Sequence, residues 1–183
     1  MLSRSQVVRF AAVAVLAMAL TGCATMNVRS YVERGTDLAR YHTYTWGPAD
    51  TLSTGDPRLD NNPFFHERIR ADVEKRLAGK RFEKTTLGTP DLLVHYHASV
   101  NQRIDVNGAD REYGYCVADD DCRPYVSEAG TLTLDLVDTR TNKVIWRGWA
   151  EGTVDGVIDN QDWMEQKIDE AVTRILERLP RNR

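Results

Sequence analysis

Apolar and polar residues alternate along several parts of this chain with the period of a β-strand. In the longest such segment, 91–104, the even positions from Leu92 to Val100 are apolar or aromatic, and the odd positions from His95 to Asn101 are polar. Shorter segments with strand character lie at 27–33, 42–46, 131–138 and 143–154. Residues 139–142, Thr-Arg-Thr-Asn, have a turn composition, which predicts an antiparallel hairpin from the last two.

Two other segments repeat apolar residues with helical spacing. The first follows Asn62-Pro63, a pair that suits a helix N-terminus, and ends at Gly79. The second begins near Asn160 and ends at Pro180. The core-facing residues predicted for the two helices are Phe65, Ile69, Val73 and Leu77, and Met164, Ile168, Val172, Ile175 and Leu179. Residues 48–62 are rich in Pro, Gly, Asp and Asn and predict a loop.

These elements predict a single two-layer α+β domain over residues 27–183. One-sided helices and half-apolar strands hide their apolar faces when both helices pack on one face of a sheet. We expect about five to six strands in an antiparallel or mixed sheet. A parallel pair is possible because 42–104 has the order strand, helix, strand, which is typical of a crossover.

The N-terminus has the layout of a secretory signal peptide. Arg4 and Arg9 supply a positive start, and residues 10–20 form an unbroken apolar run. The run has 11 residues, whereas a helix that crosses a bilayer core needs about 20. The next residues, Thr21-Gly22-Cys23, complete a tetrapeptide with Leu20 that resembles the lipobox of bacterial lipoproteins. In that motif the cysteine sulfur receives diacylglycerol and the chain is cut just before it.

The lipobox resemblance implies a signal peptide over 1–22, lipidation of Cys23, and a lipidated N-terminus with a short linker over 23–26. Two or more acyl chains give stable membrane attachment. Ala24 after the cysteine suggests the periplasmic face of the outer membrane, with inner-membrane anchoring as an alternative. Cleavage after Ala24 is another alternative, because Gly22 and Ala24 also satisfy a small-x-small rule; it would release a soluble periplasmic protein.

Charge argues against a polyanionic partner. Removal of residues 1–22 takes away two of the 24 basic residues and none of the 27 acidic ones, so the net charge becomes −5. Sequence-independent binding to polyphosphate needs clustered Lys and Arg. We therefore expect no nucleic-acid partner, and we expect contact with the membrane to come from the lipid.

Cys116 and Cys122 remain once Cys23 is assigned to the lipid, and an oxidising periplasm favours a disulfide between them. Such a bond would close a small loop and stiffen it locally. A redox or metal role is the alternative, although the spacing is unlike CxxC. Inside the loop, Asp119-Asp120-Asp121 lacks the alternating spacing that wraps calcium, so it is interpreted as a solvated acidic stretch.

Aromatic and basic residues surround the same loop. They are Tyr113, Tyr115, Arg123 and Tyr125. Tyr and Arg are enriched at binding surfaces, where they supply contact area and hydrogen bonds. We take these four as a possible partner surface, with simple packing in a strand as the alternative.

His95 and His97 are two apart on a predicted strand, so both side chains leave the same face, as in some zinc and copper sites. No third ligand is evident, and the bland interpretation is two polar residues on the wet face of a sheet; no metal is assigned. Trp46, Trp146 and Trp149 are interpreted as packing residues. Because Trp146 and Trp149 are three apart, they point to opposite faces of a regular strand, which leaves one available to stack on glycan.

Four motifs beyond the lipobox carry a family resemblance. They are Tyr44-x-Trp46, Pro90-Asp91-Leu92-x-Val94, Leu136-Val137-Asp138 and Ile145-Trp146-Arg147-Gly148. With them the chain resembles a family of uncharacterised bacterial lipoproteins that have a single domain of unknown function. The resemblance implies location and fold, and it carries no catalytic residue. The loop between Cys116 and Cys122 is not part of the pattern.

The chain shows no signature of a common enzyme class: GxSxG, HExxH and a phosphate-binding glycine loop are all missing. We expect no enzymatic activity and no cofactor. The leading hypothesis is a lipid-anchored binding or structural accessory module of the cell envelope, with an unknown envelope protein as partner. The alternative is a carrier or sensor that holds a small ligand in an apolar pocket, and a hydrolase assembled from distant residues is a third, weaker possibility.

Overall fold

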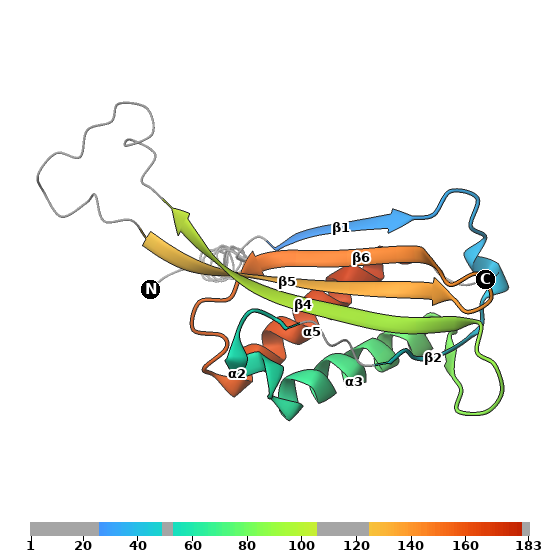
Figure 1. Cartoon of the computed structure of the whole chain (residues 1–183), viewed down its shortest axis with the longest axis horizontal. Coiled ribbons are helices and arrows are strands. Elements are labelled where there is room, and N and C mark those ends of the chain that lie inside the picture. Colours follow the sequence, from blue (N-terminus) through green and yellow to red (C-terminus); the bar gives the residue numbers. More distant parts are fainter. Residues whose placement is uncertain (1–25, 49–52, 106–124, 181–183) are drawn as a thin grey trace, which may run out of the picture.

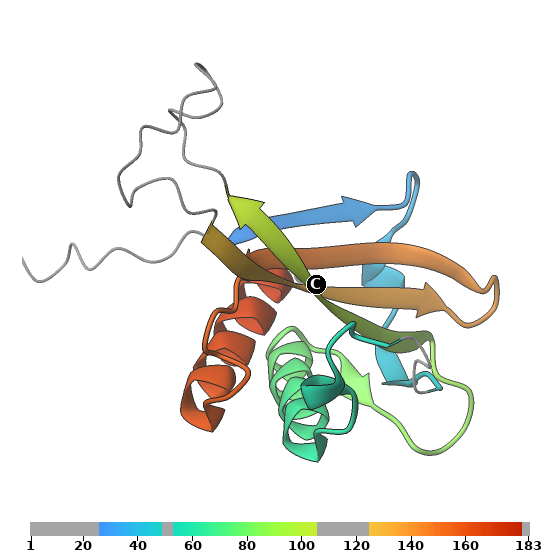
Figure 2. The same ribbon diagram turned by 60° about the vertical axis from the view of Figure 1, so that its left-hand side comes forward.

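The computed structural model of the protein covers residues 26–48, 53–105 and 125–180 and shows a two-layer α+β domain (Figure 1). One layer is a sheet, and its strands are β1 (Asn27–Val32), β2 (Thr43–Trp46), β3 (Glu83–Lys84), β4 (Leu92–Asp105), β5 (Tyr125–Asp138) and β6 (Lys143–Thr153). The helices are η2 (Leu38–Arg40), α2 (Pro57–Asp60), α3 (Pro63–Gly79) and α5 (Gln161–Glu177). The long helices α3 and α5 lie side by side on one face of the sheet (Figure 2).

The sheet is mixed, with the strand order β1-β6-β5-β4-β2-β3. The pairs β1–β6, β6–β5 and β5–β4 are antiparallel, whereas β2 is parallel to both β4 and β3. Helix α3 lies between β2 and β4 in the chain and forms the crossover between these parallel strands. The predicted fold class is therefore confirmed, including the mixed sheet and the two long helices on one face.

Both long helices begin at the predicted asparagine. The Asn62 side chain accepts a hydrogen bond from the Phe65 amide at 3.2 Å, and the Asn160 side chain accepts one from the Trp163 amide at 3.0 Å. These bonds satisfy amide groups that have no partner inside the helix. All nine predicted core-facing residues of the two helices are buried, so the helical spacing identified the correct faces.

Short elements and one strand boundary differ from the sequence prediction. The predicted loop over 48–62 contains the helix α2, whose first amide bonds to the Asp56 side chain. Strand β5 begins at Tyr125 rather than at 131, because its first residues pair with the far end of β4. The segment before 131 contains Ser, Glu, Ala and Gly, which have low strand propensity, so pairing overrides local preference there. The two-residue strand β3 was not predicted.

The side of the sheet that faces the helices tapers in side-chain size from one end to the other. Across β5 and β6, Leu136 pairs with Trp146, Leu134 with Gly148, Leu132 with Ala150, and Gly130 with Gly152. The first row is the largest, the two middle rows each pair a leucine with a small residue, and the last row has two glycines. The end with large side chains forms the dense core, and the end with two glycines leaves space between sheet and helices.

Trp146 is the centre of the dense end. Its side chain is completely buried, and its indole lies over Gly148, where an added Cβ would come within 2.4 Å of the ring and 2.7 Å of Ile175. Trp149 pairs with Thr133 on the opposite face of the sheet. The expectation that the two tryptophans face opposite ways is therefore confirmed, and Gly148 provides the room for the buried one.

We predict that Gly148→Ala lowers the free energy of unfolding by about 1–3 kcal/mol, because the added methyl group overpacks a filled core. Gly152→Ala is the matched control: the nearest atom to its added Cβ lies at 3.8 Å, in Met26. We expect this control to change stability by less than about 0.5 kcal/mol. Urea unfolding of the two variants measures the difference. Equal stability of the two would contradict the packing described for Trp146.

Candidate functional site

An apolar pocket with a volume of about 90 Å³ lies where the sheet tapers. The sheet contributes Gly130, Leu132 and Gly152 to its wall, and the helices contribute Ile69 and Ile168. The space is open over Gly152, where the nearest atom to an added Cβ lies at 3.8 Å, whereas the Val154 side chain covers Gly130, where an added Cβ would lie 2.7 Å from it. The helices α3 and α5 remain at the distance set by the larger rows. Met26, which precedes β1, also borders it.

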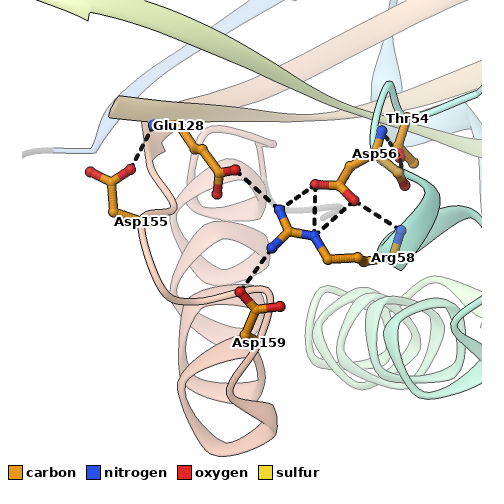
Figure 3. Close-up of polar contacts among 6 residues, drawn as sticks. All are labelled: Thr54, Asp56, Arg58, Glu128, Asp155 and Asp159. Atoms are coloured by element: carbon orange, nitrogen blue, oxygen red, sulfur yellow. Dashed lines mark hydrogen bonds and ion pairs between the residues drawn. The ribbon is translucent and has the colours of Figure 1, made fainter. Parts of the chain in front are cut away.

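An arginine and three carboxylates form a clamp beside this pocket (Figure 3). Arg58 Nη2 lies 2.6 Å from Asp56 Oδ2 and 3.1 Å from Glu128 Oε1, and Arg58 Nη1 lies 2.8 Å from Asp159 Oδ2. These four residues, called the Arg58 clamp below, come from the start of α2, from β5 and from the segment between β6 and α5. One guanidinium thus joins three parts of the chain.

The Arg58 clamp holds the rim of the pocket in place. Leu59, Gly130 and Ile158 line the pocket and lie one or two residues from Arg58, Glu128 and Asp159, respectively. Each ion pair of the clamp therefore fixes a segment that forms part of the wall. We conclude that the ion pairs of the Arg58 clamp stabilise this end of the domain, whereas the packing of large side chains stabilises the opposite end.

Short hydrogen bonds around the clamp position its acidic members. The Asp155 carboxylate accepts a hydrogen bond from the Glu128 amide at 2.6 Å, and the Val154 amide donates to the Glu128 carbonyl at 2.8 Å. The Thr54 hydroxyl accepts from the Asp56 amide at 3.1 Å. The backbone on both sides of the clamp is thereby fixed before Arg58 adds its ion pairs.

The clamp region is acidic overall. Its hydrogen bonds from Arg58 hold the pKa of Asp56 below the ordinary value of 3.8, so this carboxylate is charged at neutral pH. Arg58 faces Asp56, Glu128 and Asp159, and Asp155 lies next to them, so carboxylates outnumber the guanidinium. Lys167 also borders the pocket, but its ammonium lies 3.6 Å from Glu170. The rim therefore presents net negative charge around an apolar opening.

A second hollow, the aromatic cleft, lies where β2 ends beside β4. It has a volume of about 380 Å³, and its wall includes Trp46, Phe65, His66, Arg70 and Tyr96. The rings of Trp46 and Tyr96 meet edge to face, with centroids 6.1 Å apart. Of the residues considered in the sequence, Trp46, His95 and His97 border this cleft, whereas Trp146 lies in the core.

Most of the site residues predicted from the sequence lie outside the described ranges. They are Cys23, Tyr113, Tyr115, Cys116, Cys122 and Arg123, and the acidic stretch 119–121 lies outside these ranges as well. The lipid anchor, the disulfide and the partner surface therefore stay predictions. The backbone of Tyr125 starts β5. In the described part of the chain, no helix is long and apolar enough to span a bilayer.

His95 and His97 leave the same face of β4, opposite the helices, as the alternation predicted. The ring of His95 packs against Gly47, where a Cβ would lie 2.1 Å from it. His97 Nε2 lies 3.8 Å from the buried carboxylate of Asp135, which is bound at 2.6 Å by both Arg147 Nε and Nη2. Among residues 26–48, 53–105 and 125–180, no three His, Cys, Asp or Glu side chains are grouped as metal ligands.

Neither Arg58, which lies beside the apolar pocket, nor Arg70, which borders the aromatic cleft, was predicted from the sequence. Asp56-Pro57 is a recognisable start of a helix and could have revealed α2. The partners of Arg58 are 70 and 101 residues away in the chain, at Glu128 and Asp159. Local sequence holds no signal for pairs of that separation.

We predict that Arg58→Gln lowers the melting temperature at pH 7, because it removes the ion pairs that hold the pocket rim. The loss should shrink as pH falls below 3.8, since the depressed pKa of Asp56 contributes stability only while the carboxylate is charged. Thermal unfolding at pH 7 and near pH 3 tests this. Arg40→Gln, at an exposed position, controls for loss of a positive charge. Equal melting temperatures of the two variants at pH 7 would show that the Arg58 clamp does not stabilise the domain.

Solved structures with some likeness to this chain come from three bacteria. A PDZ domain protein from Parabacteroides distasonis has a TM-score of 0.51 and 13% identity, with coverage of 91% of this chain and 39% of that chain. A DUF4136 family protein from Bacteroides thetaiotaomicron has a TM-score of 0.48 and 12% identity, with coverage of 81% of this chain and 94% of that chain. The PelC dodecamer from Paraburkholderia phytofirmans has a TM-score of 0.47 and 13% identity, with coverage of 83% of this chain and 95% of that chain.

At these identities only the first likeness is informative, and it shows a shared fold alone. A comparison with curated proteins finds no match. The family model described as "Domain of unknown function (DUF4136)" matches residues 28–181, which is nearly the whole α+β domain. The chain therefore belongs to the DUF4136 family of domains of unknown function.

Proposed function

We propose that this protein is a non-catalytic binding module of the cell envelope, tethered through a lipid on Cys23 to the periplasmic face of the outer membrane. Its apolar pocket receives an aliphatic side chain from an envelope protein. The observation that carries the proposal is the pocket itself: an apolar hollow, open at the surface, with an acidic rim held by the Arg58 clamp.

The size of the pocket favours a side chain over a free ligand. Pockets for drug-sized molecules measure about 300–1,000 Å³, whereas this one measures about 90 Å³. Interfaces between proteins are dominated by a few anchor side chains that fill pockets on the partner. A branched aliphatic group matches both the volume and the apolar wall, which leads us to prefer an interaction module to a carrier.

Charge at the rim indicates what surrounds the anchor side chain. Glu128 and Asp159 are exposed on their side chains by 27% and 67%, respectively, and both face the rim. Basic residues next to the aliphatic anchor of the partner would complement them, and such complementarity raises association rates and selects against acidic competitors. The partner segment proposed here is therefore an aliphatic residue flanked by Lys or Arg.

The tether would hold the pocket close to the membrane. Met26 borders the pocket and is three residues from Cys23, and three residues span at most about 11 Å. A lipid on Cys23 would therefore place the pocket within a few tens of ångströms of the bilayer. The partner is then expected to be another protein at the same membrane surface.

Photo-crosslinking in cells, with a photoreactive residue at exposed Gln161, tests the proposal. Gly152→Val fills the pocket with a strand-forming side chain, and Thr153→Val places the same side chain on the opposite, exposed face of β6. We expect one dominant crosslinked protein in the parent chain and in Thr153→Val, and at least a threefold weaker crosslink in Gly152→Val. We also expect the parent chain, but not Cys23→Ser, to enter the detergent phase on cloud-point separation.

Two results would contradict the proposal. An identical crosslink in Gly152→Val and Thr153→Val would show that the pocket takes no part in binding. Partition of the parent chain into the aqueous phase would remove the lipid anchor, whatever the crosslinks show. Circular dichroism of the purified variants establishes that Gly152→Val is folded before the comparison is made.

A further inference from the structure

The aromatic cleft contains a guanidinium that is stacked on an indole. The Arg70 Cζ atom lies 5.3 Å from the centroid of the Trp46 ring, which is a cation–π distance. Trp46 is itself held, because its Nε1 donates a hydrogen bond to Glu74 Oε1 at 2.7 Å. The stacking limits the orientations of Arg70 and so prepares its N–H groups for a ligand.

No carboxylate in the described ranges forms an ion pair with Arg70. Glu74 lies one turn further along α3, but its Oε1 already accepts from Trp46 and lies 2.5 Å from Lys84 Nζ. Asp60, the acidic residue in the cleft wall, accepts at 2.6 Å from the Ser53 hydroxyl and at 2.7 Å from the Thr54 amide. Both carboxylates therefore bind other groups, and within the described ranges Arg70 has only a longer-range attraction to Glu74, which leaves its N–H groups able to bind an outside partner.

A histidine and a tyrosine supply ordered polar groups in the same cleft. His66 Nε2 lies 3.3 Å from the Asp60 carbonyl oxygen, and His66 Nδ1 lies 2.7 Å from the Tyr96 hydroxyl. Because a carbonyl only accepts, Nε2 carries the hydrogen, and in the neutral ring Nδ1 accepts from Tyr96. This hydrogen bond fixes the position of the tyrosine hydroxyl in the cleft wall.

From this arrangement we infer that the aromatic cleft binds a small ring compound that carries a carboxylate. Arg70 would bind the carboxylate with two parallel N–H···O bonds, the arrangement in which guanidinium and carboxylate match best. Trp46, Phe65 and Tyr96 would border the ring. The volume of about 380 Å³ falls within the range of sites for small molecules, unlike that of the apolar pocket.

This site is independent of the proposed function. It lies on the β2 and β4 side of α3, whereas the Arg58 clamp is made by α2, β5 and the segment before α5. Failure of the side-chain pocket would leave the cleft intact, and failure of the cleft would leave the pocket intact. The two hollows share Phe65 and Ala98 in their walls, so neither residue is used in a test.

Two acids with different rings serve as probes for calorimetric titration of the purified protein. Benzoate has a flat aromatic ring, and glucuronate has a sugar ring; benzyl alcohol and glucose are the matched neutral compounds. We expect at least one acid to bind, with an affinity at least about tenfold above that of its neutral match, because a guanidinium–carboxylate pair is lost in the latter. The acid that binds tells an aromatic from a carbohydrate ligand.

Two charge-matched substitutions on α3 test the role of Arg70. Arg70→Gln should weaken binding of the acid by about tenfold or more, whereas Lys75→Gln, at an exposed position of the same helix, should change it less than about twofold. Arg70→Lys keeps the charge without the planar fork and should lie between them.

The inference is overturned by any of three results. The first is that neither acid binds at about 10 mM, a concentration at which even a weak site is occupied. The second is that the neutral compound binds as tightly as its acid. The third is that Arg70→Gln binds the acid with the same affinity as the parent chain. Unchanged thermal unfolding of Arg70→Gln and Arg70→Lys shows that any loss is local to the cleft.

Discussion

The structure depends on how side-chain size is distributed over the face of the sheet that packs against the helices. In protein interiors close packing is the rule, and a row of small residues facing a helix leaves either a shifted helix or a hollow. Here the row of Trp146 holds α3 and α5 away from the sheet. At the row of Gly130 and Gly152 the Val154 side chain covers Gly130, and the space over Gly152 stays open. The apolar pocket is the consequence of that mismatch.

The same constraint explains why the chain places an ion cluster at the tapered end. With little apolar burial available there, α2 is only four residues long and would not be stable alone. Arg58 joins it to β5 and to the segment before α5, each a part of the pocket rim. Surface ion pairs taken singly add little stability, but a guanidinium shared among three carboxylates defines the position of three segments at once.

Local signals allowed much of the fold to be predicted. The asparagines at 62 and 160 begin helices because their side chains bond the first free amides, and alternation marked β4 because one of its faces is dry. The hollows could not be predicted, since they depend on which rows pair across strands and on a register shift between Leu136 and Val137. From the sequence, Arg70 is indistinguishable from the other solvated residues of an amphipathic helix. Its contact with Trp46 depends on where β2 lies in the folded domain.

Crystals of the protein kept under xenon pressure test the taper most directly, because apolar cavities stay dry and take up xenon. The account predicts xenon density between Gly130, Gly152 and Ile168 in the parent chain and none there in crystals of Gly152→Val. A parent structure in which side chains of α3 or α5 fill that space, with no xenon bound, would contradict it.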